Sequence, residues 1–252
     1  MKICYFTATG NSLYVARRIG GELLSIPKLM RQESIDITDD AVGLVCPVYA
    51  VEMPMMVRDF IARANIKTDY LFFIYTYGMG YAEAFAHAKK ATDAAGMKIH
   101  YIHAIQMVDN YLPVFEMQNQ IDTLPSKNVE SQIDRVCRDI AERKQIDIPI
   151  TEHTEAEIAK YTAMLAVPIL RKDTARNYIV NDKCTRCGIC AKVCPANNIT
   201  VTDHVYFADR CEVCYACLHN CPQNALHHPS EQSAVRFRNE HVTLKDIISA
   251  NQ

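Results

Sequence analysis

Residues 184–199 read CTRCGICAKVCPANNI and residues 211–226 read CEVCYACLHNCPQNAL, so one cysteine pattern occurs twice in this chain of 252 residues. The two stretches lie 27 residues apart, and all four cysteines, the following proline and one asparagine coincide. Both have the form C-x2-C-x2-C-x3-C-P. The repeat predicts two similar units, each built around the same kind of ligand.

The spacing of these cysteines indicates iron–sulfur clusters. Three thiolates two residues apart can surround one [4Fe–4S] cubane, and the fourth cysteine of such a run ligates the other cluster. Zinc is the alternative, but its sites usually gather four ligands from paired C-x2-C units. A disulfide framework would suit a small secreted chain. The prediction is two [4Fe–4S] clusters, one held by Cys184, Cys187, Cys190 and Cys221 and the other by Cys211, Cys214, Cys217 and Cys194.

Residues 181–229 as a whole resemble the bacterial two-cluster ferredoxins. The resemblance implies a small α+β ferredoxin-like domain that carries single electrons. Cysteine fills all eight ligand positions, so no open coordination site for a substrate is expected.

Residues 1–143 alternate short apolar runs with helical patterns, which predicts an α/β fold with a doubly wound parallel sheet of about five strands. Residues 144–180 are expected to form a connector that is helical over Thr151–Leu170, and residues 230–252 a tail with a helix at Thr243–Ala250. The expected strands are Ile3–Phe6, Val42–Cys46, Tyr70–Tyr75 and Lys98–Met107, and the expected helices are Asn11–Leu24, Pro54–Ala64, Tyr81–Ala95 and Glu130–Arg143.

A hydroxyl-rich loop follows the first expected strand and directly precedes a helix. It consists of Thr7, Ala8, Thr9, Gly10, Asn11 and Ser12. Backbone amides at a helix N-terminus, together with hydroxyl groups, form a site for a phosphate without any lysine or arginine. An ordinary turn with a Ser or Thr cap is the alternative for such a loop.

This loop resembles the FMN phosphate loop of flavodoxins, whose pattern is [ST]-x-T-G-x-[ST]. The resemblance implies a flavodoxin-like domain over residues 1–143, with FMN at the carboxyl ends of the strands. Tyr49 is the candidate to stack on the flavin ring. In that family the loops after the third and fourth strands hold the ring, which here implies Pro47, Val48 and Tyr49 together with Thr76, Tyr77, Gly78 and Gly80.

The order of the two parts resembles a family of flavodoxin–ferredoxin fusion proteins. The stretches 108–113 and 236–241 also look like that family, and Asn110 and Tyr111 could reach the flavin edge. The resemblance implies an electron-transfer protein that passes single electrons between two [4Fe–4S] clusters and FMN, with a separate redox protein as donor or acceptor.

Two other functions remain open. An FMN-dependent reductase of a small substrate would use the ferredoxin module as its electron inlet, and Tyr77, Tyr111 and Cys46 could line its pocket. A dedicated reductant of one partner enzyme is the third hypothesis, supported only by the connector and the tail. No catalytic residue is predicted, and an electron carrier is favoured over a substrate-converting enzyme.

Composition excludes several kinds of partner. The formal net charge is −2 without any block of like charges, so neither nucleic acid nor an anionic membrane is expected. The apolar stretches are shorter than the ~20 residues of a membrane helix, and residues 1–6 lack the apolar region of a signal peptide. A cytoplasmic protein is expected, and two oxygen-sensitive clusters favour an anaerobe.

Overall fold

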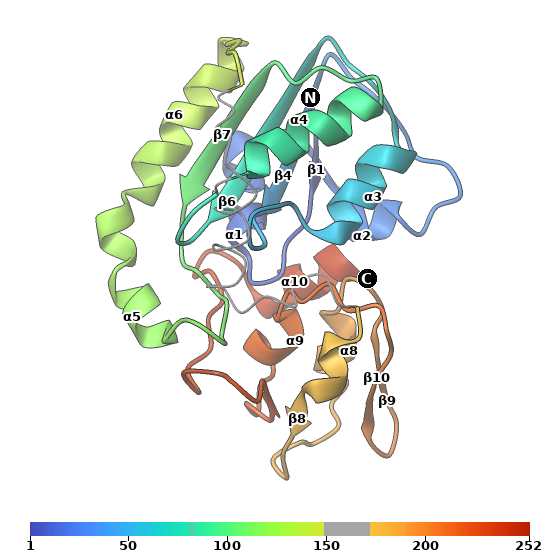
Figure 1. Ribbon diagram of the computed structural model, residues 1–252, viewed down its shortest axis with the longest axis vertical. Helices are drawn as coiled ribbons and strands as arrows, with labels where there is room; N and C mark the ends of the chain where they lie inside the picture. The colour runs from blue at the N-terminus through green and yellow to red at the C-terminus, as the bar shows by residue number, and fades with distance from the viewer. Residues whose placement is uncertain (82, 149–171) are drawn as a thin grey trace, which may run out of the picture.

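A computed structural model describes residues 1–81, 83–148 and 172–252 of the chain. Its larger part contains a five-stranded parallel sheet (Figure 1). Counted along the chain, the strands of this sheet lie in the order second, first, third, fourth and fifth from one edge to the other. This is the strand order of flavodoxin-like doubly wound folds, so the predicted fold class is confirmed. In spatial order the strands are β2 (Glu22–Ser25), β1 (Lys2–Tyr5), β4 (Ala41–Pro47), β6 (Tyr70–Tyr77) and β7 (Tyr101–Gln106).

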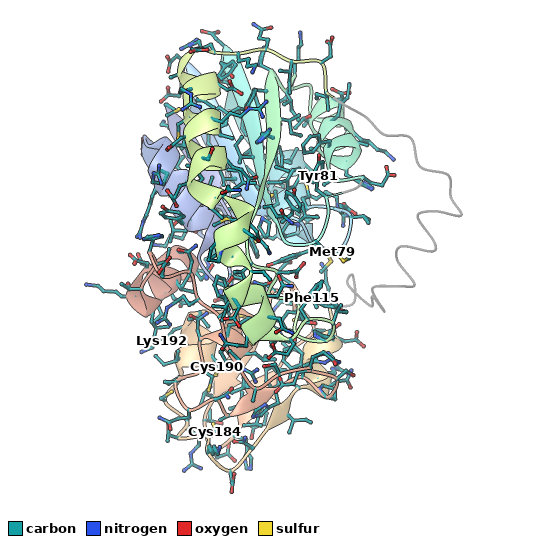
Figure 2. The ribbon with its side chains drawn as sticks, turned by 90° about the vertical axis from the view of Figure 1, so that its left-hand side faces the viewer. Met79, Tyr81, Phe115, Cys184, Cys190 and Lys192 are labelled. Carbon is teal, nitrogen blue, oxygen red and sulfur yellow. The ribbon has the colours of Figure 1, made fainter. Side chains whose placement is uncertain are left out.

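Helices cover both faces of this sheet. Helices α1 (Asn11–Ile19) and α6 (Val129–Ala141) pack together on one face, and α3 (Met55–Arg63) and α4 (Ala84–Ala94) pack together on the other (Figures 1 and 2). Nearly every residue of β4 and β6 is buried, as expected for parallel strands covered on both sides.

The helix predicted over Asn11–Leu24 is wrong in its second half. Helix α1 ends at Ile19, and Glu22–Ser25 forms the edge strand β2. Gly20 and Gly21 have φ angles of +86° and +101°, a left-handed conformation that ends a helix and favours glycine. The other predicted strands and helices of the first 143 residues are present, with ends shifted by a few residues.

Short elements that the sequence did not predict complete this part. Strands β3 (Asp36–Thr38) and β5 (Asn65–Lys67) form a separate parallel pair. Helix α2 (Ile26–Leu29) follows β2 and packs on α3, while α5 (Met117–Asp122) and the 3-10 helix η1 (Leu124–Lys127) precede α6.

The cysteine-rich part is a small unit of two antiparallel strand pairs and two short helices. Strand β8 (Ile179–Val180) pairs with β11 (Leu226–His227), and β9 (Ile199–Val201) pairs with β10 (Val205–Phe207). Helices α8 (Ile189–Lys192) and α9 (Ala216–His219) lie at equivalent positions of the two cysteine runs and pack against each other. The 3-10 helix η2 (Thr174–Asn177) precedes β8.

The C-terminal tail returns to the sheet and ends in helix α10 (Leu244–Asn251), as predicted. Helix α10 packs against α2 and begins with a capping box between Thr243 and Asp246. Asn251 near its end donates through Nδ2 to the carbonyl oxygen of Val193, at 3.1 Å, in the first cysteine run. The tail therefore contacts both parts of the chain.

The helix predicted over Thr151–Leu170 lies outside the described residues. Within the described residues, no helix is both long enough and apolar enough to cross a membrane.

Candidate cofactor sites

The loop after β1 holds the first candidate site. Gly10 stands before the first residue of α1 with a φ of +104°, and its amide donates to Oγ1 of Thr7 at 3.2 Å. Oγ1 of Thr9 accepts a hydrogen bond from Nδ2 of Asn110 at 2.9 Å. Among the described residues no side chain caps the start of α1, which leaves its first amides available to an anion.

A cavity opens beside this loop at the carboxyl ends of β1, β4, β6 and β7, the edge where open α/β sheets bind ligands. Oγ of Ser12 lies 2.9 Å from Oγ1 of Thr76 and joins two of the loops. Gly10 does not line this cavity, and a side chain at this position would instead meet Asn239 and Val242 of the tail. The predicted residues on its walls are Thr7, Ala8, Thr9, Asn11, Ser12, Pro47, Val48, Tyr49, Thr76, Tyr77 and Gly78.

A second cavity adjoins the first and lies between the two parts of the chain. One side comes from the loops of the sheet and includes Tyr49, Gly80 and Tyr111. The other side comes from the second cysteine run, through Val213 and Tyr215. Figure 2 shows Met79 and Phe115, which also line it, between the sheet and the cysteine-rich part. A ligand in this cavity would touch both parts of the chain.

Tyr49 lines both cavities and has an unusual hydroxyl group. Its Oη atom is buried and has no hydrogen-bond partner among the described residues. Its ring meets that of Phe6 edge to face, with centroids 6.2 Å apart. Burial raises the pKa of Tyr49 well above its usual value, so the hydroxyl keeps its proton and can donate it. An orphaned buried donor beside two cavities fits a ligand with a polar edge, such as a flavin ring.

Asp109 fixes the loops after β6 and β7 to each other. Its carboxylate accepts hydrogen bonds from the amides of Met79 at 3.2 Å and Tyr111 at 3.1 Å. Burial raises the pKa of Asp109 above its ordinary value, although these two amides oppose the shift. Asp109 could not be selected from the sequence, because one aspartate after a strand carries no distinctive signal.

The eight cysteines of the repeat line two further cavities. We call the first the outer thiol cavity, because its Cys187 is exposed and its Cys184 and Cys221 are half-buried. We call the second the inner thiol cavity, because all four of its cysteines are buried. The outer cavity is lined by Cys184, Cys187, Cys190 and Cys221, and the inner cavity by Cys194, Cys211, Cys214 and Cys217.

The same three left-handed backbone turns occur in both cysteine runs. Gly188 and Tyr215 are equivalent in the repeat, with φ angles of +75° and +55°. Arg186 and Val213 are also equivalent, with φ angles of +56° and +52°, as are Asn197 and Asn224. A branched residue such as Val213 rarely adopts this conformation. Here it occurs directly before Cys214, which lines the inner thiol cavity.

The thiols of the inner cavity are held in their neutral form when no ligand is bound. Burial raises the pKa of Cys211 to about 11 and that of Cys214 and Cys217 well above the usual value, and neighbouring thiols add to the effect. Backbone amides partly oppose this, since Val213 N–H donates to Sγ of Cys211 at 3.3 Å. A cationic iron–sulfur core would reverse the balance, because metal ligands must be thiolates.

A single zinc ion needs four ligands gathered closely around one point. Within residues 1–81, 83–148 and 172–252, no three His, Cys, Asp or Glu side chains form a group that could hold one metal ion. The four thiols of each cavity line one hollow instead, as the four ligands of a cubane would.

The family described as 4Fe-4S binding domain matches residues 177–200, which include the first cysteine run. No curated protein matches the chain. Among solved structures, the two-electron reduced flavodoxin of Megasphaera elsdenii is 17% identical with a TM-score of 0.29, covering 41% of this chain and 83% of its own. The Trp repressor binding protein of Bacillus subtilis is 10% identical with a TM-score of 0.31, and the match covers 50% of this chain and 94% of that protein. A flavodiiron core from Synechocystis is 12% identical with a TM-score of 0.28, and the match covers 55% of this chain and 36% of that protein.

Cys46 and the two other cysteines outside the repeat line none of these cavities. Cys46 and Cys4 are fully buried in strands of the sheet, and Cys137 is half-buried on α6. Cys46 lines neither of the two cavities at the sheet edge. The reductase hypothesis supposed that Cys46 lines a pocket beside the flavin ring, but Cys46 does not contribute to either cavity.

Proposed function

We propose that this chain is an electron-transfer protein that holds two [4Fe–4S] clusters and one FMN. The observation that carries the proposal is the second cavity, whose walls come jointly from the loops of the sheet and from the second cysteine run. A flavin ring there would lie next to Val213 and Tyr215, the two neighbours of the proposed cluster ligand Cys214 in the sequence. When bound, the clusters would supply one-electron steps and FMN would accept one or two electrons.

The residues around the first cavity suit the phosphate and ribityl end of FMN. The amides at the start of α1 and the hydroxyl groups of Thr7, Thr9 and Ser12 offer hydrogen bonds to a phosphate. Tyr49 would border the ring and could donate its unpaired hydroxyl proton to a polar atom of the flavin.

The outer and inner thiol cavities would each hold one cluster. The ligand sets are those that line the cavities, so each run would give three cysteines to one cluster and its fourth to the other. Because Cys187 is exposed, a redox partner protein would reach the outer cluster more closely than the inner one.

Anaerobic purification with iron, sulfide and flavin quantified on the same sample tests the proposal. About eight irons and one FMN per chain are expected from the ligand sets. About eight irons without flavin, even after anaerobic reconstitution with FMN, would overturn the flavin part and leave a ferredoxin unit beside an empty α/β domain.

A reductase of a small substrate is the second candidate. Met79 on the rim of the second cavity is 45% exposed and the nearby Tyr81 is 38% exposed, so apolar surface remains at its edge (Figure 2). A planar acceptor such as a quinone or a nitro compound could approach there. A steady-state screen with quinones, nitro compounds, disulfides and oxygen tests this candidate, and negligible turnover with all of them would reject it.

A dedicated reductant of one enzyme has less support, because the tail that motivated it has another role. The amide of Asn239 donates to the carbonyl oxygen of Thr9 at 2.8 Å, and Nδ2 of Asn239 donates to Oδ1 of Asn11 at 3.1 Å. This stretch of the tail is thus engaged with the phosphate loop.

A further inference from the structure

The two cysteine runs match at every cysteine, but they differ in what stands between the third and the fourth. Three residues stand there in each run, and the last two are Lys192 and Val193 in the first run and His219 and Asn220 in the second. Lys192 is exposed, as Figure 2 shows, whereas His219 and Asn220 are 4% and 3% exposed. The repeat is therefore asymmetric at positions that ligate no cluster.

His219 uses both of its ring nitrogens. Nε2 lies 2.9 Å from the carbonyl oxygen of Asn110, and Nδ1 accepts a hydrogen bond from the amide of Phe237 at 3.1 Å. Since Nδ1 accepts, the proton is on Nε2 and is donated to Asn110. One side chain in the second cysteine run thus holds both the loop after β7 and the C-terminal tail.

Asn220 makes a matching contact with the phosphate loop. Its Nδ2 donates to the carbonyl oxygen of Ala8 at 3.3 Å and to that of Ala216 at 2.9 Å. Ala8 lines the first cavity. The second cysteine run is therefore hydrogen-bonded to the loops after β1 and β7, two of the four loops that form the candidate flavin site.

These contacts continue into the flavin site itself. Asn110, whose carbonyl His219 holds, lines both cavities at the sheet edge and donates through Nδ2 to Oγ1 of Thr9. His219 and Asn220 lie between Cys217 of the inner cavity and Cys221 of the outer cavity. Cys217 and Cys221, which clusters would hold, therefore stand on either side of the two residues that are hydrogen-bonded to loops of the candidate flavin site.

We propose that His219 and Asn220 are positioning residues that couple cluster loading to FMN binding. The inference rests on the proposed function. Ligation of Cys217 and Cys221 would hold α9 in place, and α9 would hold Asn110 and Ala8 in the arrangement that FMN requires. Because coupling between two binding sites is reciprocal, bound FMN would also favour retention of the clusters.

Substitutions at His219 separate its two hydrogen bonds. In His219→Gln, the amide Nε2 takes the place of ring Nε2, which keeps the bond to Asn110 and loses the bond to Phe237. In His219→Asn, Oδ1 takes the place of ring Nδ1, which keeps the bond to Phe237 and loses the bond to Asn110. Lys192→Gln is the matched control, because Lys192 occupies the equivalent place in the first run and is exposed.

The dissociation constant of FMN is measured by quenching of flavin fluorescence, on cluster-loaded protein from which flavin has been removed. His219→Asn is expected to weaken FMN binding about tenfold, which corresponds to about one lost hydrogen bond. His219→Gln and Lys192→Gln are expected to stay within about twofold of the unsubstituted protein. Equal affinities for His219→Asn and His219→Gln, at equal iron content and equal thermal midpoints, would overturn the assignment of His219.

The coupling is tested by repeating the titration after the clusters have been removed with a chelator. The unsubstituted protein is expected to bind FMN about tenfold more weakly without clusters, and His219→Asn to show little further change. Equal affinity with and without clusters would overturn the coupling while leaving the proposed function intact. Failure of every form to bind FMN would overturn the proposed function as well.

Discussion

Gly78 lies so close to Asp109 that a side-chain carbon on Gly78 would stand 2.1 Å from Cβ of Asp109. The two residues belong to the loops after β6 and β7, and both line the first cavity. Asp109 also accepts a hydrogen bond from the amide of Met79. The contact between the loops therefore depends on the absence of a side chain at position 78.

Gly78→Ala is expected to separate these loops and to weaken FMN binding at least tenfold. The overlap is with Cβ, Cγ and Oδ2 of Asp109. Because the position of Cβ is set by the backbone, a rotamer change of Asp109 cannot relieve it, and we expect a stability cost of about 1–3 kcal/mol. Flavin fluorescence titration and thermal unfolding measure the two effects. With FMN in excess, iron content should stay unchanged, since the thiol cavities lie in the other part of the chain.

Gly96→Ala is the control for a general loss of stability. Gly96 has a φ of +72° and open space around its Cα, so alanine there costs about 1 kcal/mol of strain without a steric overlap. The dissociation constant of FMN should not change. If both substitutions weakened FMN binding equally, the effect of Gly78→Ala would reflect general destabilisation rather than the contact with Asp109.

The exchange of the fourth ligand between the two cysteine runs predicts opposite results for two double substitutions. Cys184→Ser with Cys221→Ser removes two ligands of one cluster, so about half of the iron should remain in an intact cluster. Cys184→Ser with Cys194→Ser removes one ligand from each cluster, so both should be damaged. Iron content and the electron paramagnetic resonance signal of the reduced protein distinguish these outcomes. If each run kept its own four cysteines, the two results would be reversed.

The sequence predicted the features whose signals are local. The cysteine spacing, the hydroxyl-rich loop and the apolar runs of β4 and β6 each lie within a few consecutive residues, and their chemistry or periodicity can be read directly. Strand β2 was missed because Leu23 continues the apolar spacing of α1, while Gly20 and Gly21 end the helix through a backbone conformation that periodicity does not detect.

The residues that join the two parts could not be predicted in the same way. The bond from His219 to Asn110 spans 109 positions of the chain, and that from Asn220 to Ala8 spans 212. Neither residue belongs to a recognised pattern, and each acts by holding a backbone carbonyl group, which any sequence supplies. The one signal available was the difference between the repeats at these places, His219 where the first run has Lys192.

Tyr49→Phe is expected to weaken FMN binding about five- to tenfold without destabilising the flavin-free protein. The buried hydroxyl has no partner among the described residues, so its removal relieves an unsatisfied group when FMN is absent and loses about one hydrogen bond when FMN is present. Fluorescence titration and thermal unfolding of the flavin-free protein measure these effects. An unchanged dissociation constant would show that Tyr49 contributes only its ring.

Tyr75→Phe is the matched control for the removal of a tyrosine hydroxyl. Tyr75 is also fully buried, but its hydroxyl donates to the carbonyl oxygen of Ala84 at 3.1 Å. Its loss should lower stability by about 1 kcal/mol and leave FMN binding unchanged. Tyr49→Phe is thus expected to change the affinity for FMN, and Tyr75→Phe is expected to change only the stability.

Asp246→Asn is expected to loosen α10 in a manner that depends on pH. Asp246 is ion-paired with Arg17 and accepts from the amide of Thr243 at 2.8 Å, and these donors hold its pKa below the usual value. Because the folded pKa is lowered, the stabilisation is complete above the ordinary pKa of about 4 and is lost as the pH falls through the folded pKa. The substitution should cost about 1 kcal/mol, and the difference in urea midpoint should be constant from pH 8 to about pH 5 and shrink below pH 4.

Asp93→Asn, which breaks only the exposed pair with Lys89, should change the midpoint little at any pH. A difference that grew as the pH fell would contradict the assigned role of the Asp246 carboxylate.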